Sequence, residues 1–94
     1  MALSEFRQIP GVGSDMEAHL MSLGLTNLAE LAKENPEELY TRDCLQFGQP
    51  LDKCILYVFR CAVYYARTPE EHRDPEKLKW PYWKDHRLDE EEPA

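Results

Sequence analysis

A short glycine-containing segment, Ile-Pro-Gly-Val-Gly at residues 9–13, is the part of this chain best suited to bind a ligand. Gly11 and Gly13 can take positive φ and let another backbone come close, while Val12 is expected to fill the core of the turn. The N–H groups that follow begin a predicted helix, and such unpaired donors favour anions, phosphate above all. The expected contacts to a nucleic-acid phosphate are therefore Gly11, Val12, Gly13 and Ser14.

The charge around this turn opposes strong binding to nucleic acid. Asp15 and Glu17 occupy the positive end of the helix dipole, where each such interaction is worth about 0.3–1 kcal/mol. The whole chain has a formal net charge of −7, whereas a nucleic-acid-binding domain usually carries a basic face. Counterion release would be small, so we expect only a weak, sequence-independent contact with DNA. The alternative is that the turn simply joins two helices.

A second candidate site combines cations and aromatic rings between residues 77 and 87. Aromatic faces with interleaved cations are surfaces on which the bases of a single strand stack. The alternative is a latch, in which the rings fold back over a helical core and the cations point outward. The residues concerned are Lys77, Lys79, Trp80, Tyr82, Trp83 and Lys84.

Cations spaced seven residues apart form a third candidate on one predicted helix. Lys53, Arg60 and Arg67 share a single stripe, which Tyr57 and Tyr64 flank. This stripe could be a basic ridge that touches phosphate or an acidic partner. Together with surplus apolar surface of the same helix, it could also form an interface with a second copy or another protein. The alternative is the solvated edge of a buried helix, where long side-chain stems cover apolar surface.

The cysteines and histidines show no comparable pattern. Cys44, Cys54 and Cys61 form no Cys-x-x-Cys pair and no close Cys/His pair, so we expect no metal and no other cofactor. No nucleophile–base spacing stands out, so we expect neither catalytic residues nor an enzyme. An odd number of cysteines favours a reducing cytoplasm. Since neither a long apolar run nor a signal-peptide pattern is present, no membrane association is expected.

The elements that would position these residues are all helical, because apolar residues recur with helical periodicity and no segment alternates as a strand does. Helices are expected at residues 3–8, 14–23, 28–32, 36–47 and 53–66. Asn35 and Asp52 are the expected caps of the last two helices. The last helix is apolar nearly all round, as is typical of a helix at the centre of a core. We expect one domain over residues 1–88 and a disordered acidic tail over residues 89–94.

Several segments, taken in order, resemble a known family. They are residues 9–13 with 23–25, 36–40, 52–66 and 78–85. They are similar to the small bacterial pathogenicity-locus proteins, a family also described as mitomycin-resistance-like, and to the C-terminal domain of the TfoX competence regulators. The resemblance implies an all-α, SAM-like bundle of about five helices with a helix-hairpin-helix motif, in a cytoplasmic bacterial protein linked to DNA repair or drug resistance. It would make the turn at residues 11–13 the phosphate-facing one.

The sequence therefore predicts a non-enzymatic binding module whose helix-hairpin-helix contacts the DNA backbone weakly and without sequence preference. One departure from the motif is Glu17, which stands where helix-hairpin-helix motifs commonly have a small residue. The alternative prediction is a protein-interaction or homodimerisation module that does not bind DNA.

Overall fold

Every regular element in the described part of the chain, residues 5–88, is helical in the computed structural model. The α-helices are α1 (Ser14–Ser22), α2 (Leu28–Ala32), α3 (Pro36–Phe47) and α4 (Lys53–Arg67). The 3₁₀ helices are η1 (Glu5–Gln8), η2 (Glu70–His72), η3 (Pro75–Leu78) and η4 (Trp80–Lys84). The predicted all-α fold is therefore confirmed as a small helical bundle. Within the described residues, the expected first helix is the 3₁₀ helix η1, and the expected acidic tail at 89–94 lies outside the described residues.

Local side chains set where the helices begin and end. The side chains of Asn27, Asn35 and Asp52 accept backbone N–H bonds at the starts of α2, α3 and α4. Pro36 takes the first position of α3, where a backbone N–H would have no partner within the helix and its absence costs nothing. The same helix ends at Gly48, whose φ of 71° is the left-handed conformation that glycine adopts most readily. The predicted bounds of α3 are thus confirmed, because these signals act within a few residues.

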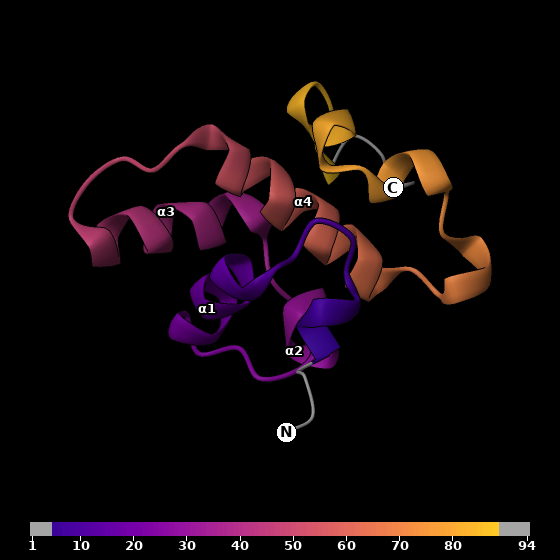
Figure 1. Cartoon of the computed structure of the whole chain (residues 1–94), viewed down its shortest axis with the longest axis horizontal. Helices are drawn as coiled ribbons and strands as arrows, with labels where there is room; N and C mark the ends of the chain where they lie inside the picture. Colours follow the sequence, from indigo (N-terminus) through magenta and orange to yellow (C-terminus); the bar gives the residue numbers. More distant parts are fainter. Residues whose placement is uncertain (1–4, 89–94) are drawn as a thin grey trace.

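Helix α4 forms the centre of the fold, as its apolar sequence predicted. It packs against α2, α3 and the C-terminal segment that contains η3 and η4, and Figure 1 shows α3 and α4 side by side, joined by the loop at residues 48–52. Residues 58–64 of α4 are all buried. Val12 from the glycine turn and Trp83 from η4 enter the same core, with exposed fractions of 6% and 0%. The glycine turn and η4 therefore both contribute a side chain to the core that contains α4.

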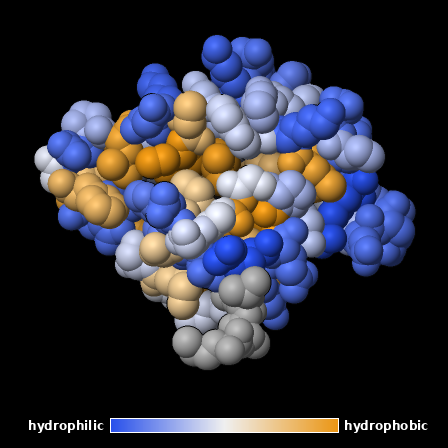
Figure 2. Space-filling model, in the orientation of Figure 1, coloured by the Kyte–Doolittle hydropathy of each residue, from blue (hydrophilic) through white to orange (hydrophobic). Residues whose placement is uncertain are grey.

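The large hydrophobic side chains that are most exposed lie on α1 and α3 rather than on α4. We expected a surplus on α4, but the exposed large hydrophobic residues among those described are Met21 on α1 and Leu45 and Phe47 on α3. Figure 2 shows apolar residues gathered in a band over α3 and α4 on one face of the molecule. Within residues 5–88, each helix is too short or too polar to cross a lipid bilayer.

Candidate functional site

The turn at residues 9–13 connects η1 to α1 through a tight backbone reversal. The amide of Val12 donates to the carbonyl oxygen of Ile9 at 3.1 Å. Between them Gly11 has a φ of 88°, which residues with a β-carbon rarely adopt. Gly13 differs from the expectation of positive φ, since its φ of −98° is that of an extended N-cap residue. Only the first glycine is therefore required by backbone conformation.

The first turn of α1 leaves backbone donors without partners. The first hydrogen bond of the helix runs from the amide of Glu17 to the oxygen of Gly13 at 2.9 Å, and no side chain caps the amides before it. Within residues 5–88, the N–H groups of Ser14, Asp15 and Met16 make no hydrogen bond. Such a helix start is a site where an anion gains both hydrogen bonds and a favourable dipole.

Two carboxylates stand beside these amides, and they differ in how far they are neutralised. Glu17 lies 3.7 Å from the guanidinium of Arg7, so a neighbouring cation offsets part of its charge. Asp15 is exposed and has no ion pair within the described residues. The unpaired charge that opposes an anion here therefore belongs to Asp15.

The fold brings the glycine turn and the basic-aromatic segment together. A β-carbon placed on Gly11 would lie 3.4 Å from Cδ1 of Trp80, so the indole lies against the backbone of the turn. Trp80 is only partly buried. The neighbouring Lys79 is exposed and pairs loosely with Glu76 at 3.5 Å. Two regions that the sequence identified separately thus meet at the contact between Gly11 and the indole of Trp80.

The rest of the aromatic segment forms the latch rather than a stacking site. Trp83 is fully buried, and its indole N–H donates to the carbonyl oxygen of Lys77 at 2.8 Å. Its ring packs against those of Tyr64 and Tyr82 at centroid distances of 5.5 and 5.0 Å. The suggestion that Trp83 stacks on a base is therefore wrong, because its ring fills the core. Lys84 remains exposed.

The predicted basic ridge is interrupted by the burial of its central residue. Arg60 is 8% exposed. Its Nε donates to Oε2 of Glu37 at 2.7 Å, and its Nη1 donates to the carbonyl oxygens of Trp83 at 2.7 Å and His86 at 3.3 Å. The expectation that Arg60 points to solvent is wrong, because the C-terminal segment folds over this part of α4.

Other members of the ridge also have structural roles. Arg67 donates to the carbonyl oxygens of Ala32, the last residue of α2, and of Glu34 just after it, at 2.7 and 3.0 Å. The hydroxyl of Tyr64 is buried and accepts a backbone N–H just before η3 at 2.9 Å. Tyr57 is partly exposed, with its ring centroid 5.7 Å from the guanidinium of Arg60. Of the three cations, Lys53 alone is exposed and makes no side-chain hydrogen bond or ion pair with the described residues.

All three cysteines are free, and two of them, Cys54 and Cys61, are poorly suited to chemistry at neutral pH. Burial raises the pKa of Cys61 to about 12. A hydrogen bond with the side chain of Asp52 raises the pKa of the exposed Cys54. Because the thiolate is the reactive and metal-binding form, both residues are weak nucleophiles and ligands. Within residues 5–88, no three His, Cys, Asp or Glu side chains are grouped to hold a metal ion.

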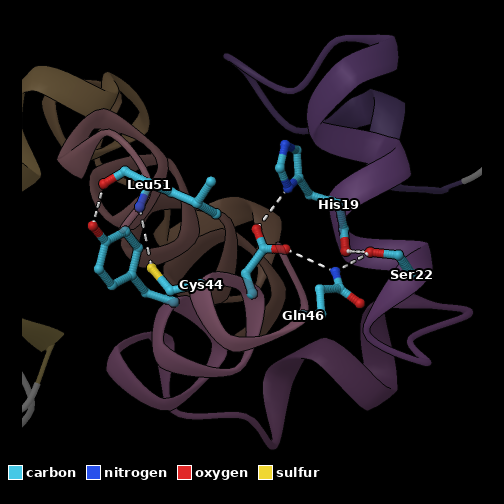
Figure 3. A network of polar contacts seen from close by, with 7 residues as sticks. His19, Ser22, Cys44, Gln46 and Leu51 are labelled. Carbon is cyan, nitrogen blue, oxygen red and sulfur yellow. Dashed lines mark hydrogen bonds and ion pairs between the residues drawn. The ribbon is translucent and has the colours of Figure 1, made fainter. Parts of the chain in front are cut away.

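A buried carboxylate that no sequence pattern singled out lies between α1 and α3. Asp43 is fully buried, and its Oδ2 lies 2.6 Å from Nδ1 of His19. Its Oδ1 accepts from Nε2 of Gln46 at 2.8 Å, and this amide also donates to Oγ of Ser22 at 2.7 Å. Figure 3 shows this network. The available signal was helical spacing, because Asp43 stands one turn after the buried Leu39 on the same face of α3.

These features define a class: a small all-α domain in which a glycine turn leads into a helix with unpaired N-terminal amides. The chain belongs to the Cdd1 pathogenicity locus family, whose model matches residues 1–89. It is 33% identical over 80 residues to the mitomycin resistance protein McrB of Streptomyces lavendulae, an alignment that covers 81% of this chain and 76% of that protein. No solved structure matches significantly. The predicted resemblance to the pathogenicity-locus, mitomycin-resistance-like family is confirmed.

Proposed function

We propose that this protein is a non-enzymatic DNA-binding module that holds the phosphate backbone at the start of α1. The observation that supports the proposal is the contact of the Trp80 indole with Gly11, in the turn that leads directly into the unpaired amides of Ser14 and Asp15. A phosphate at those amides would have its neighbouring base within reach of the ring. Donors for the backbone and an aromatic surface for the base are the two parts of a site for an unpaired nucleotide.

The charge of the chain sets the strength of this contact. With Arg60 buried and Lys79 paired to Glu76, few cations are available to displace counterions. Each phosphate neutralised contributes a slope of about −0.7 to −0.9 in log affinity against log salt. We expect a slope no steeper than about −2, which corresponds to weak binding without sequence preference.

The proposal extends to the motif, the setting and the biological role. The turn at residues 9–13 would be a helix-hairpin-helix, within a SAM-like bundle of a cytoplasmic bacterial protein. One relative is named for mitomycin resistance. We propose that this chain acts at DNA, in drug resistance or DNA repair.

The test is fluorescence anisotropy with labelled single-stranded and duplex DNA at low salt. Gly13→Ser places a hydroxyl cap over the amides while meeting nothing within 4 Å, so the fold is kept and the anion site is occupied. We expect this variant to bind at least threefold more weakly, and Trp80→Ala to lose the preference for a single strand. Lys53→Ser, which removes an exposed cation on α4, serves as the control and is expected to bind as the wild type does. Absence of binding by the wild type, or equal binding by Gly13→Ser, would overturn the proposal.

The second candidate function is a protein-interaction or homodimerisation module. It is favoured by three exposed apolar side chains. Met21 on α1 is 53% exposed, and Leu45 and Phe47 on α3 are 75% and 53% exposed. Light scattering over a range of protein concentrations tests the homodimer. A monomer at every concentration would exclude self-association and leave only a different partner.

A further inference from the structure

A groove that adjoins the proposed DNA site at Asp15 runs along α1 where this helix faces the end of α3. Its volume is about 380 Å³, and it is lined by Asp15, Ala18, His19, Ser22 and Phe47. The α1 residues recur at the three- and four-residue spacing that places side chains on one face of a helix. The groove therefore presents a carboxylate, an imidazole and a hydroxyl from α1, opposite an aromatic ring from α3.

The imidazole of His19 is held in one orientation by a hydrogen bond to the buried Asp43. The buried carboxylate of Asp43 accepts hydrogen bonds at both of its oxygens, from His19 Nδ1 at 2.6 Å and from Gln46 at 2.8 Å. Since a carboxylate only accepts, Nδ1 of His19 donates in this hydrogen bond, and in the Nδ1–H tautomer that the bond selects, Nε2 is an acceptor. Figure 3 shows this second nitrogen pointing away from Asp43. It makes no hydrogen bond to any residue in the described range 5–88.

A carboxylate and an exposed aromatic ring complete the lining of the groove. Asp15 has no ion pair or hydrogen bond from its side chain within residues 5–88. Phe47 is 53% exposed, and its ring centroid lies 5.4 Å from that of His19 at an angle of 46°. No lysine or arginine lines the groove. It thus offers hydrogen-bond acceptors, one negative charge and an aromatic face, and it would repel an anion.

We propose that this groove binds the guanidinium group of an arginine side chain presented by a partner protein. Guanidinium is planar, carries only donors, and stacks on aromatic rings while it pairs with a carboxylate. Asp15 supplies the carboxylate, Nε2 of His19 a second acceptor, and Phe47 the ring. The net charge of −7 favours such a cationic partner. Because no cation in the lining could hold the carboxylate of free arginine, the ligand is a side chain within a protein.

The test uses N-acetyl-arginine amide as the probe and follows the side-chain NMR signals of His19 and Phe47. We expect saturable shifts of both residues. N-acetyl-citrulline amide, a neutral analogue of nearly the same shape, is expected to bind at least tenfold more weakly. Free arginine is expected to bind no more tightly than the amide. Equal binding of the citrulline probe, or tighter binding of free arginine, would overturn the proposal.

A matched pair of variants distinguishes binding of the arginine probe in this groove from its non-specific attraction to an acidic protein. Asp15→Asn is expected to weaken the arginine probe at least threefold, whereas Glu71→Gln, an exposed acid on η2 outside the groove, is expected to change nothing. Asp15→Asn should also strengthen DNA binding, because it removes a charge beside the α1 amides. The two sites therefore respond to one substitution with opposite signs. An unchanged probe affinity in Asp15→Asn contradicts the groove alone and leaves the DNA proposal standing.

Discussion

Nη1 of Arg60 donates to the carbonyl oxygen of Trp83 at 2.7 Å, so a buried guanidinium on α4 holds the C-terminal segment in place. The same group pairs through Nε with Glu37 on α3 at 2.7 Å. Three elements that are distant in the sequence meet at this one charge. Removing this guanidinium would leave a carboxylate and buried carbonyl oxygens without their donor. The resulting loss of folding free energy is larger than the net contribution of the intact pair.

The first prediction concerns this guanidinium. Arg60→Ala should lower the free energy of unfolding by about 3 kcal/mol, because the buried acceptors lose their partner. Lys53→Ala, an exposed cation on the same helix, should change it by less than about 0.5 kcal/mol. Urea unfolding followed by circular dichroism measures both. Similar small effects for the two variants would show that Arg60 is not the tie between α3, α4 and η4.

The second prediction distinguishes the two tryptophans. Trp83 is fully buried while Trp80 is partly exposed, so in Trp80→Phe the remaining emission should be blue-shifted and resistant to acrylamide. In Trp83→Phe the remaining emission should be quenched more readily. This second variant should also be less stable by about 1–3 kcal/mol, since it removes volume and an indole N–H bond from the core. Equal quenching in both variants contradicts the latch.

The third prediction compares the glycines of the turn. Gly11→Ala should cost about 1–2 kcal/mol, because its φ of 88° is unfavourable for a residue with a β-carbon. Gly13→Ala should be nearly neutral, because φ is −98° and a β-carbon there meets nothing within 4 Å. Thermal unfolding of the two variants is the measurement. If Gly13→Ala is the more damaging change, the turn does not have the conformation described.

The fourth prediction concerns the pH dependence of stability at Cys61. Burial raises its pKa from 9.0 to about 12 in the folded protein. The unfolded chain therefore releases this proton first, so the stability linked to it is intact below pH 9 and falls between pH 9 and 12. The loss is at most about 1.4 kcal/mol per pH unit.

Cys61→Ala isolates this effect, because other titrating groups are common to both proteins. At pH 8 the wild type should be more stable than the variant, whose smaller side chain leaves a cavity. At pH 10 that advantage should shrink by about 1 kcal/mol, as the unfolded wild type ionises. An advantage that is the same at both pH values would mean that the thiol is not buried.

Much of the secondary structure could be predicted because the signals are local. Asn35, Pro36 and Gly48 act on backbone groups within a few residues, so they define α3 whatever surrounds it. Residues 53–67 are apolar on nearly all sides of the helix. Such a helix is expected at the centre of the fold, because at the surface one apolar side would face water. The 3₁₀ form of η1 was not predicted, because a segment this short depends on its packing for its exact hydrogen-bond pattern.

The candidate sites depend on contacts between distant parts of the chain. Lys53, Arg60 and Arg67 share one stripe by their spacing, and nothing in that spacing indicates that the C-terminal segment covers the middle residue. The contact between Gly11 and Trp80 is equally absent from any local pattern. Sequence patterns indicate which face of its own helix a residue occupies, but not which element packs against that face.

The sequence by itself determined that this chain is an all-helical domain with α4 at its centre and a glycine turn leading into α1. The tertiary structure alone decided which polar groups are buried and which remain open to a ligand. The physical reason is that helix formation is governed by backbone bonds and caps within one turn. The state of Asp43, His19 and Arg60 is governed instead by desolvation and by partners on other elements, which exist only once the helices have packed.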